Sequence, residues 1–247
     1  MATRIPPLRA GECQVWWARR TAASLPLLAI LDERERERWS RFMREEDKGL
    51  YLVAHATLRL VLAAHSGVVA PAIRFSTICR FCGATHGKPR LEDGAGALEF
   101  SLSHSGLYAV LAVCRAVPLG IDVEQVKPER DRTRLIEGVL SDIERRAIEA
   151  LPTEQQGLAF LRYWTRKEAL LKATGHGLAI PLKSVTVSAH DAPPALLSWA
   201  AEPPLEAPAQ LLDLAAPSGH LAALALLGER LDVVERDAAP LLAGPNI

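Results

Sequence analysis

The chain has 247 residues, of which 49% are hydrophobic and 23% are charged, so it can bury a substantial core and is not intrinsically disordered. Its 29 Lys and Arg residues balance 29 Asp and Glu residues, so no overall positive charge favours nucleic acid. Apolar runs such as Leu25–Leu31 are far shorter than the roughly 20 residues that a membrane-spanning helix needs. We therefore expect a cytoplasmic protein that binds neither nucleic acid nor membrane.

In the first half, helix signals come before strand signals. Asp32 is a candidate N-cap of a charged helix, and apolar residues at helical spacing predict a longer helix over Tyr51–Ala64, which Gly67 and Pro71 end. Strands are predicted at Ile73–Ile78, Leu98–Ser103 and Leu107–Cys114. The last two strands are expected to form a hairpin around a turn at residues 104–106.

The second half follows a candidate junction at residues 115–119. Helices are predicted from the Ser141–Glu144 capping box through Leu151 and from Thr153 to about Lys172. Strands are predicted at Gly120–Val126, Ser184–Ser188 and Leu221–Leu227. The Pro- and Ala-rich segment Pro193–Pro217 yields no assignment. In each half a long helix leads through a loop with Gly and Pro to paired strands, although sequence identity alone does not establish a repeat.

Two carboxylates share one face of the strand that opens the second half. Alternation along Gly120–Glu124 places Ile121 and Val123 on one face and Asp122 and Glu124 on the other. Neighbouring acids repel each other unless water or a cation lies between them, and Mg²⁺ prefers such oxygen ligands together with substrate phosphate. The alternative is an ordinary solvated strand face.

A second unusual pattern lies on the long helix of the same half. Leu161, Trp164, Glu168 and Lys172 fall within one stripe, so two charged residues continue an apolar face. Burying charge there is costly unless that end of the helix opens onto a site. A surface pair of Glu168 and Lys172, four residues apart, is the alternative.

Three further segments carry anion-binding side chains. Ser101–Gly106 offers hydroxyls, a histidine and turn amides, as either an anion cradle or a polar hairpin turn. Lys88 follows Gly87 on a loop that Pro89 makes rigid. Arginines interleaved with acids form a solvated helix surface in which one or two could hold a phosphate, namely Arg34, Arg36, Arg38, Arg41 and Arg44.

A zinc site is a weaker possibility. Cys79, Cys82 and His86 have the spacing of half a structural zinc site. Such a site generally needs four ligands, and no second Cys/His pair follows at suitable spacing.

The order of four motifs is more specific than any one of them. These are Gly87-Lys88-Pro89, Phe100–Ser105, Gly120–Glu124 and Trp164–Lys172. In this combination the chain resembles the 4′-phosphopantetheinyl transferases, in the large two-halved form that activates surfactin-type synthetases. The resemblance runs from about Asp32 to Leu227. It implies a monomer with an α+β fold of two pseudo-symmetric halves, residues 1–117 and 118–247, each a long helix packed on a small, mostly antiparallel sheet.

The resemblance also implies roles for individual residues. Asp122, Glu124 and Glu168 would hold Mg²⁺, or Mn²⁺ in its place, against the coenzyme A diphosphate. Glu168 would accept the serine proton, directly or through water, and Lys172 would neutralise or protonate the leaving phosphate. Contacts to the nucleotide and its phosphates are implied for Arg38, Lys88, Ser103, His104 and Lys167. Glu144 falls where the family often has an acid near the metal, a role that competes with its capping box.

The implied reaction moves the phosphopantetheine arm of coenzyme A to a serine of an apo acyl or peptidyl carrier protein and releases 3′,5′-ADP. Carrier proteins are typically acidic around that serine, so a basic and apolar rim near Arg166 and Lys167 is the predicted docking surface. Two other functions stay open at this point: a zinc-containing binding module without catalysis, and a hydrolase acting on a phosphate ester.

Overall fold

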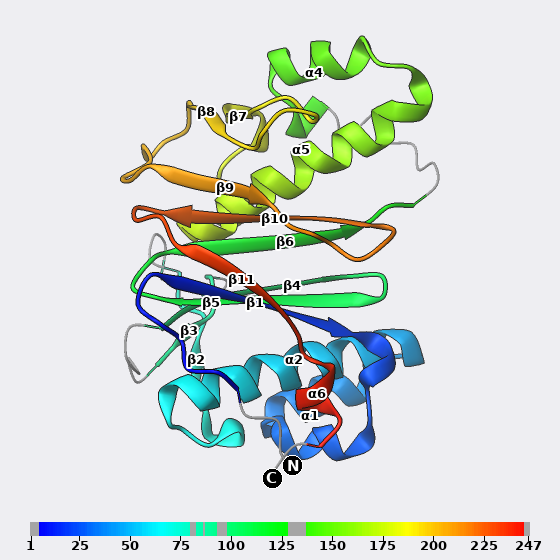
Figure 1. The fold of residues 1–247 in the computed structure, drawn as a ribbon, viewed down its shortest axis with the longest axis vertical. Coiled ribbons are helices and arrows are strands. Elements are labelled where there is room, and N and C mark those ends of the chain that lie inside the picture. Colours follow the sequence, from blue (N-terminus) through cyan, green and yellow to red (C-terminus); the bar gives the residue numbers. More distant parts are fainter. Residues whose placement is uncertain (1–4, 80–82, 86, 93–97, 128–136, 245–247) are drawn as a thin grey trace. The chain divides into compact units, whose positions relative to one another are not determined.

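The computed structural model describes residues 5–79, 83–85, 87–92, 98–127 and 137–244 (Figure 1). The chain divides into two compact units: unit 1 takes residues 1–76, 89–116 and 231–247, and unit 2 takes 77–88 and 117–230. These units differ from the predicted halves, because 77–88 and Val117 group with unit 2 and 231–247 groups with unit 1. Among the described residues, every helix is too short or too polar to cross a membrane.

Unit 1 is a four-stranded sheet with one long helix packed on it. Its elements are β1 (Glu12–Arg19), α1 (Glu33–Ser40), α2 (Glu45–Ser66), β2 (Phe75–Ser76), β3 (Arg90–Leu91), β4 (Leu98–Ser105), β5 (Tyr108–Arg115), β11 (Asp232–Asp237) and α6 (Ala239–Leu242). The strand order is β11-β1-β5-β4, with only the β1–β11 pair parallel. The core lies between α2 and this sheet.

Unit 2 repeats this plan with a three-stranded sheet. Its elements are β6 (Leu119–Gln125), α4 (Asp142–Glu149), α5 (Thr153–Thr174), β7 (Val185–Val187), β8 (Leu196–Trp199), β9 (Ala209–Asp213) and β10 (His220–Leu227). The strand order is β6-β10-β9, all antiparallel, and α5 packs on all three strands. The predicted class, α+β with a long helix on a small and mostly antiparallel sheet, is confirmed.

The two units share more than their strand order. Both α2 and α5 have 22 residues and end at a glycine in the left-handed conformation, Gly67 with φ 77° and Gly175 with φ 77°. A residue with a Cβ is strained there, so glycine ends both helices cleanly. The order β1-β5-β4 in unit 1 corresponds to β6-β10-β9 in unit 2.

Several predicted elements have different bounds in the structure. Helix α2 begins at Glu45 rather than Tyr51, because three acidic residues in its first turn interact favourably with the helix dipole. The predicted strand Ile73–Ile78 is reduced to β2, and the unassigned segment Pro193–Pro217 contains β8 and β9. Strand β1 carries no alternation between apolar and polar residues that would predict it, because seven of its eight residues are buried.

A buried cation occupies the fifteenth position of each long helix. In α2 this is Arg59, which is fully buried and pairs with Asp32 and Glu35 at the start of α1. In α5 it is Lys167, also fully buried, which pairs with Glu144 at the start of α4. Each glutamate also accepts a hydrogen bond from the backbone N–H of the N-cap residue of its own helix, Asp32 for Glu35 and Ser141 for Glu144. The cation therefore fastens a short helix to the long one in both units.

The Glu35 network predicts how unit 1 responds to acid. Burial alone would raise the pKa of Glu35, but hydrogen bonds and charges from His55 and Arg59 lower it below the ordinary value of 4.5. Its contribution to stability is thus present above that value and is lost as the pH falls through the lowered pKa. We expect urea unfolding to show a falling free energy below about pH 4.5, and Glu35→Gln to flatten that slope. An unchanged slope in the variant would contradict the assignment.

Candidate active site

Strand β6 presents two acids on the face that meets α5. Ile121 and Val123 are buried on one face, while Gly120, Asp122 and Glu124 alternate onto the other. A Cβ added to Gly120 would lie 2.1 Å from the carbonyl oxygen of Ala169 in α5. The missing side chain therefore lets the helix backbone approach the strand beside its two carboxylates.

This close approach makes Gly120→Ala a destabilising substitution. The clash involves backbone atoms of α5, which cannot turn aside as a flexible side chain can. We expect a loss of about 3 kcal/mol or more in the free energy of unfolding, measured with urea. Gly138→Ala is the matched control in the same unit, since a Cβ there meets nothing within 4 Å. Equal stability of the two variants would refute the close packing.

Helix α5 contributes the other two residues of the predicted site. The Nζ atom of Lys172 lies 2.7 Å from Oδ1 of Asp122 and donates a second hydrogen bond to the carbonyl oxygen of Ile121 at 3.2 Å. Burial raises the pKa of Glu168, the negative charges of Asp122 and Glu124 raise it further, and Lys172 opposes the shift. Three carboxylates and one ammonium group thus interact on one side of α5.

The carboxylates of Asp122, Glu124 and Glu168 suit a hard divalent cation whose remaining coordination positions are filled by substrate phosphate and water. Among the described residues, no group of three or more His, Cys, Asp or Glu side chains is arranged to hold a metal ion by itself, and Lys172 binds Asp122. Mg²⁺ commonly takes only one or two carboxylates and fills its other positions with phosphate and water. Carboxylate repulsion that raises the pKa of Glu168 is what a cation would relieve. The chemistry of these residues therefore fits Mg²⁺.

The contacts of Lys167 favour a structural role over the predicted coenzyme contact. Its side chain is fully buried, and its amine pairs with Glu144 and donates to the carbonyl oxygens of Val139 at 2.7 Å and Leu182 at 3.2 Å. Glu144 is 1% exposed and also accepts a hydrogen bond from the N–H of Val187. Both residues therefore have internal partners for their charged groups.

The predicted docking rim at Arg166 is wrong. Arg166 is fully buried, and its guanidinium group bonds to Asp213 and to backbone carbonyls of the segment between β7 and β8. A side chain without exposed surface cannot dock a partner. Charge reversal there would disrupt unit 2 rather than test carrier binding.

Lys88 is tethered within unit 2. Its Nζ atom donates to the carbonyl oxygen of Leu119, at the start of β6, at 2.8 Å. Gly87 packs directly on Cys79, since an added Cβ would lie 2.7 Å from the Cα atom of that residue. Of the three residues considered for zinc, Cys79 is buried, while Cys82 and His86 lie outside the described residues.

The remaining predicted nucleotide contacts belong to unit 1. Ser103 is buried in β4, and His104 is exposed at the next position, opposite Ala109 of β5. Arg38 is exposed at the end of α1, with its guanidinium carbon 5.7 Å from the centroid of the Tyr51 ring. The other four arginines of that region are exposed as well, as a solvated surface requires.

Comparison with known proteins identifies the family. The model of the 4′-phosphopantetheinyl transferase superfamily matches residues 118–225, and that of the 4′-phosphopantetheinyl transferase N-terminal region matches residues 15–116. The 4′-phosphopantetheinyl transferase HetI of Nostoc sp. is 34% identical over 205 residues, covering 82% of this chain and 81% of HetI. The transferase Sfp of Bacillus subtilis is 30% identical over 163 residues, covering 66% of this chain and 68% of Sfp.

These matches define a class of enzyme that transfers phosphopantetheinyl groups. The chain belongs to the 4′-phosphopantetheinyl transferase family, in its large two-part form, and the predicted transferase class is confirmed. A holo-(acyl-carrier-protein) synthase from Bacillus anthracis, solved in complex with CoA (3′,5′-ADP), is more distant, with a TM-score of 0.39 and 21% identity over 45% of this chain and 96% of that one.

Proposed function

We propose that the protein transfers the 4′-phosphopantetheine arm of coenzyme A to a serine hydroxyl of an apo acyl or peptidyl carrier protein, with Mg²⁺ and release of 3′,5′-ADP. The observation that carries this proposal is the group of Asp122, Glu124, Glu168 and Lys172 between β6 and α5, in a chain of the transferase family. We further propose that the enzyme acts in the cytoplasm as a monomer.

In the proposed reaction the serine oxygen attacks the phosphorus atom that carries the pantetheine arm, and the bond from this phosphorus to the oxygen of 3′,5′-ADP breaks. Asp122, Glu124 and Glu168 would hold Mg²⁺, which when bound neutralises the diphosphate charge. A carboxylate oxygen of Glu168 accepts the serine proton, directly or through water. The ammonium group of Lys172 neutralises or protonates the leaving phosphate.

Four predicted nucleotide contacts are kept in the proposal. Lys88, Ser103, His104 and Arg38 are proposed to contact the nucleotide and its phosphates. Charged donors such as Arg38 and Lys88 form the strongest hydrogen bonds to phosphate oxygens. Lys167 is not proposed as a nucleotide contact, because its amine already has three buried partners.

Mass spectrometry of apo carrier proteins tests the proposal. Carriers from fatty-acid, polyketide and nonribosomal peptide assembly are incubated with coenzyme A, Mg²⁺ and the protein, and each is expected to gain one phosphopantetheinyl group if it is a substrate. A carrier with its serine replaced by alanine and a reaction with chelator are the controls. No gain on any carrier would contradict the proposal, and coenzyme A breakdown without a carrier would indicate a hydrolase instead.

A further inference from the structure

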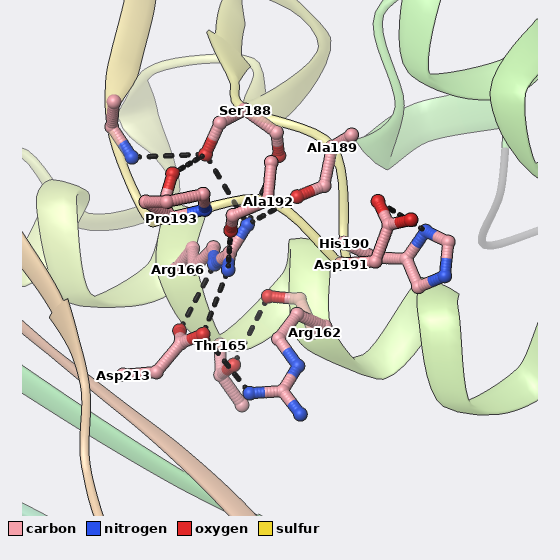
Figure 2. Close-up of polar contacts among 11 residues, drawn as sticks. Arg162, Thr165, Arg166, Ser188, Ala189, His190, Asp191, Ala192, Pro193 and Asp213 are labelled. Carbon is pink, nitrogen blue, oxygen red and sulfur yellow. Dashed lines mark hydrogen bonds and ion pairs between the residues drawn. The ribbon is translucent and has the colours of Figure 1, made fainter.

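A fully buried arginine lies near the proposed catalytic residues of α5. All five N–H groups of Arg166 have acceptors: the two carboxylate oxygens of Asp213 at 2.9 and 2.7 Å, and the carbonyl oxygens of Ser188, Ala189 and Ala192 at 3.0, 2.9 and 3.0 Å (Figure 2). Arg162, one turn earlier, adds a bond to Asp213 at 3.0 Å. This is a bidentate ion pair with every donor satisfied, the geometry that fixes orientation most firmly.

The partner of this arginine lies in the same row of the sheet as the proposed metal ligand. Asp213 of β9 is opposite Ala223 of β10, and Ala223 is opposite Asp122 of β6. Residues directly opposite each other point to the same face, so both aspartates face α5, about 10 Å apart across two strand spacings. The only side chain between them in the row is the methyl group of Ala223.

Helix α5 is bound to this row on both flanks. Arg166 pairs with Asp213, and Lys172 pairs with Asp122. At 3.6 residues per turn these two cations project about 120° apart around the helix, with Ala169 midway between them and close to Gly120. Glu168 projects about 40° from Lys172. The two ion pairs together fix the rotation of α5, and with it the direction in which Glu168 points.

Unit 1 shows the same skeleton without these charges. Aligning α2 with α5 by their terminal glycines places Leu58 at the position of Arg166. Aligning β5 with β10 by their eight residues each places the row Leu102–Leu111–Trp16 at the position of Asp213–Ala223–Asp122. Leu60 and Ala64 take the positions of Glu168 and Lys172. An apolar pair is therefore sufficient to pack this helix on its sheet in the unit that lacks the acids.

We propose that Arg166 and Asp213 are a positioning pair that sets the rotation of α5, so that Glu168 points toward the face of β6 that carries Asp122 and Glu124, where the proposed cation would bind. This inference rests on the proposed function and adds two residues that do not touch the substrate. The fold does not need a charged pair at this place, as Leu58 and Leu102 of unit 1 show. What the charged pair adds is directional contact, which a leucine pair cannot supply.

The double variant Arg166→Leu/Asp213→Leu tests the inference, because it copies the pair of unit 1. Asp213→Leu leaves the buried guanidinium group of Arg166 without its carboxylate and is expected to melt well below the wild type. Arg166→Leu leaves Asp213 with Arg162 alone and is expected to melt lower as well, whereas the double variant recovers most of the loss of Asp213→Leu. In the folded double variant we expect kcat for transfer to fall about tenfold or more, since small misplacements of reacting groups are costly. Mn²⁺ binding with coenzyme A present, measured by electron paramagnetic resonance, is expected to weaken severalfold, while KM for the carrier stays unchanged.

Two further variants keep the test decisive. Asp213→Asn keeps the volume of the side chain and removes its charge. It is expected to lower kcat and Mn²⁺ affinity, as the leucine pair does, and it carries the test if the leucine pair does not fold. Arg145→Met, which removes a half-exposed arginine of α4, is the control and is expected to match the wild type. Wild-type kcat and Mn²⁺ affinity in a folded double variant, or in Asp213→Asn, would overturn the inference. A wild-type protein that modifies no carrier would instead refute the proposed function.

Discussion

Asp122→Ala is expected to reduce phosphopantetheinyl transfer by at least about a hundredfold and to leave the protein folded. The substitution removes a proposed metal ligand and the partner of Lys172. Its structural cost is small, about 1 kcal/mol, because the Lys172 side chain is 29% exposed and can turn to water. It also removes a negative charge that acts on Glu168. Activity on an apo carrier and the free energy of unfolding in urea are the two measurements.

Asp142→Ala is the matched control for this prediction. Asp142 belongs to the same unit, is 88% exposed and pairs only loosely with Arg145, at 3.6 Å. We expect it to retain wild-type activity. Full activity of Asp122→Ala would remove the carboxylates of β6 from the mechanism, whereas a variant that unfolds would show that Asp122 serves the fold.

The face of β6 that carries Asp122 and Glu124 could be predicted from sequence, because side chains of any extended strand alternate between its two faces. Once residues 120–124 are extended, Asp122 and Glu124 must share a face, and the apolar residues between them assign that face. Likewise, helical spacing alone puts Glu168 and Lys172 on one side of α5. Both patterns are local, so neither required knowledge of the rest of the chain.

The burial of Arg166 and Lys167 could not be predicted in this way. Their partners are distant along the chain: Glu144 precedes Lys167 by 23 residues, and Asp213 follows Arg166 by 47. A run of charged residues on a helix normally indicates solvent, and only tertiary packing shows that these two cations bind buried acceptors. The one available signal was the matched spacing of the two long helices, which puts Lys167 where unit 1 has Arg59.

Strands β1 and β11 show a related limit. β1 is buried on both faces, so it carries no alternating pattern, and its parallel partner β11 lies more than two hundred residues later. A parallel pair needs no adjacent turn, which removes the short-range signal that revealed the hairpin of β4 and β5. Long-range pairing therefore accounts for most of what sequence patterns missed in unit 1.

Lys167→Met is expected to lower the free energy of unfolding by about 3–5 kcal/mol, because it leaves the buried carboxylate of Glu144 without its cation. Burial lowers the pKa of Lys167 and Glu144 opposes that shift, so the charged amine depends on the pair. Replacing both residues, Lys167→Met with Glu144→Leu, is expected to recover much of the loss. Arg59→Met in unit 1 should show a similar loss, since it breaks the corresponding pair with Glu35.

The same double variant separates a structural lysine from a coenzyme contact. If Lys167 only fastens α4 to α5, the folded double variant binds coenzyme A with wild-type affinity in isothermal titration calorimetry. If its amine met a phosphate of the coenzyme, losing that charged contact would weaken binding about tenfold, as expected for roughly 1.5 kcal/mol or more. Weaker coenzyme A binding by the folded double variant would therefore show that Lys167 contacts the nucleotide. Unchanged binding would assign the buried cation of both long helices to the fold that the two units share.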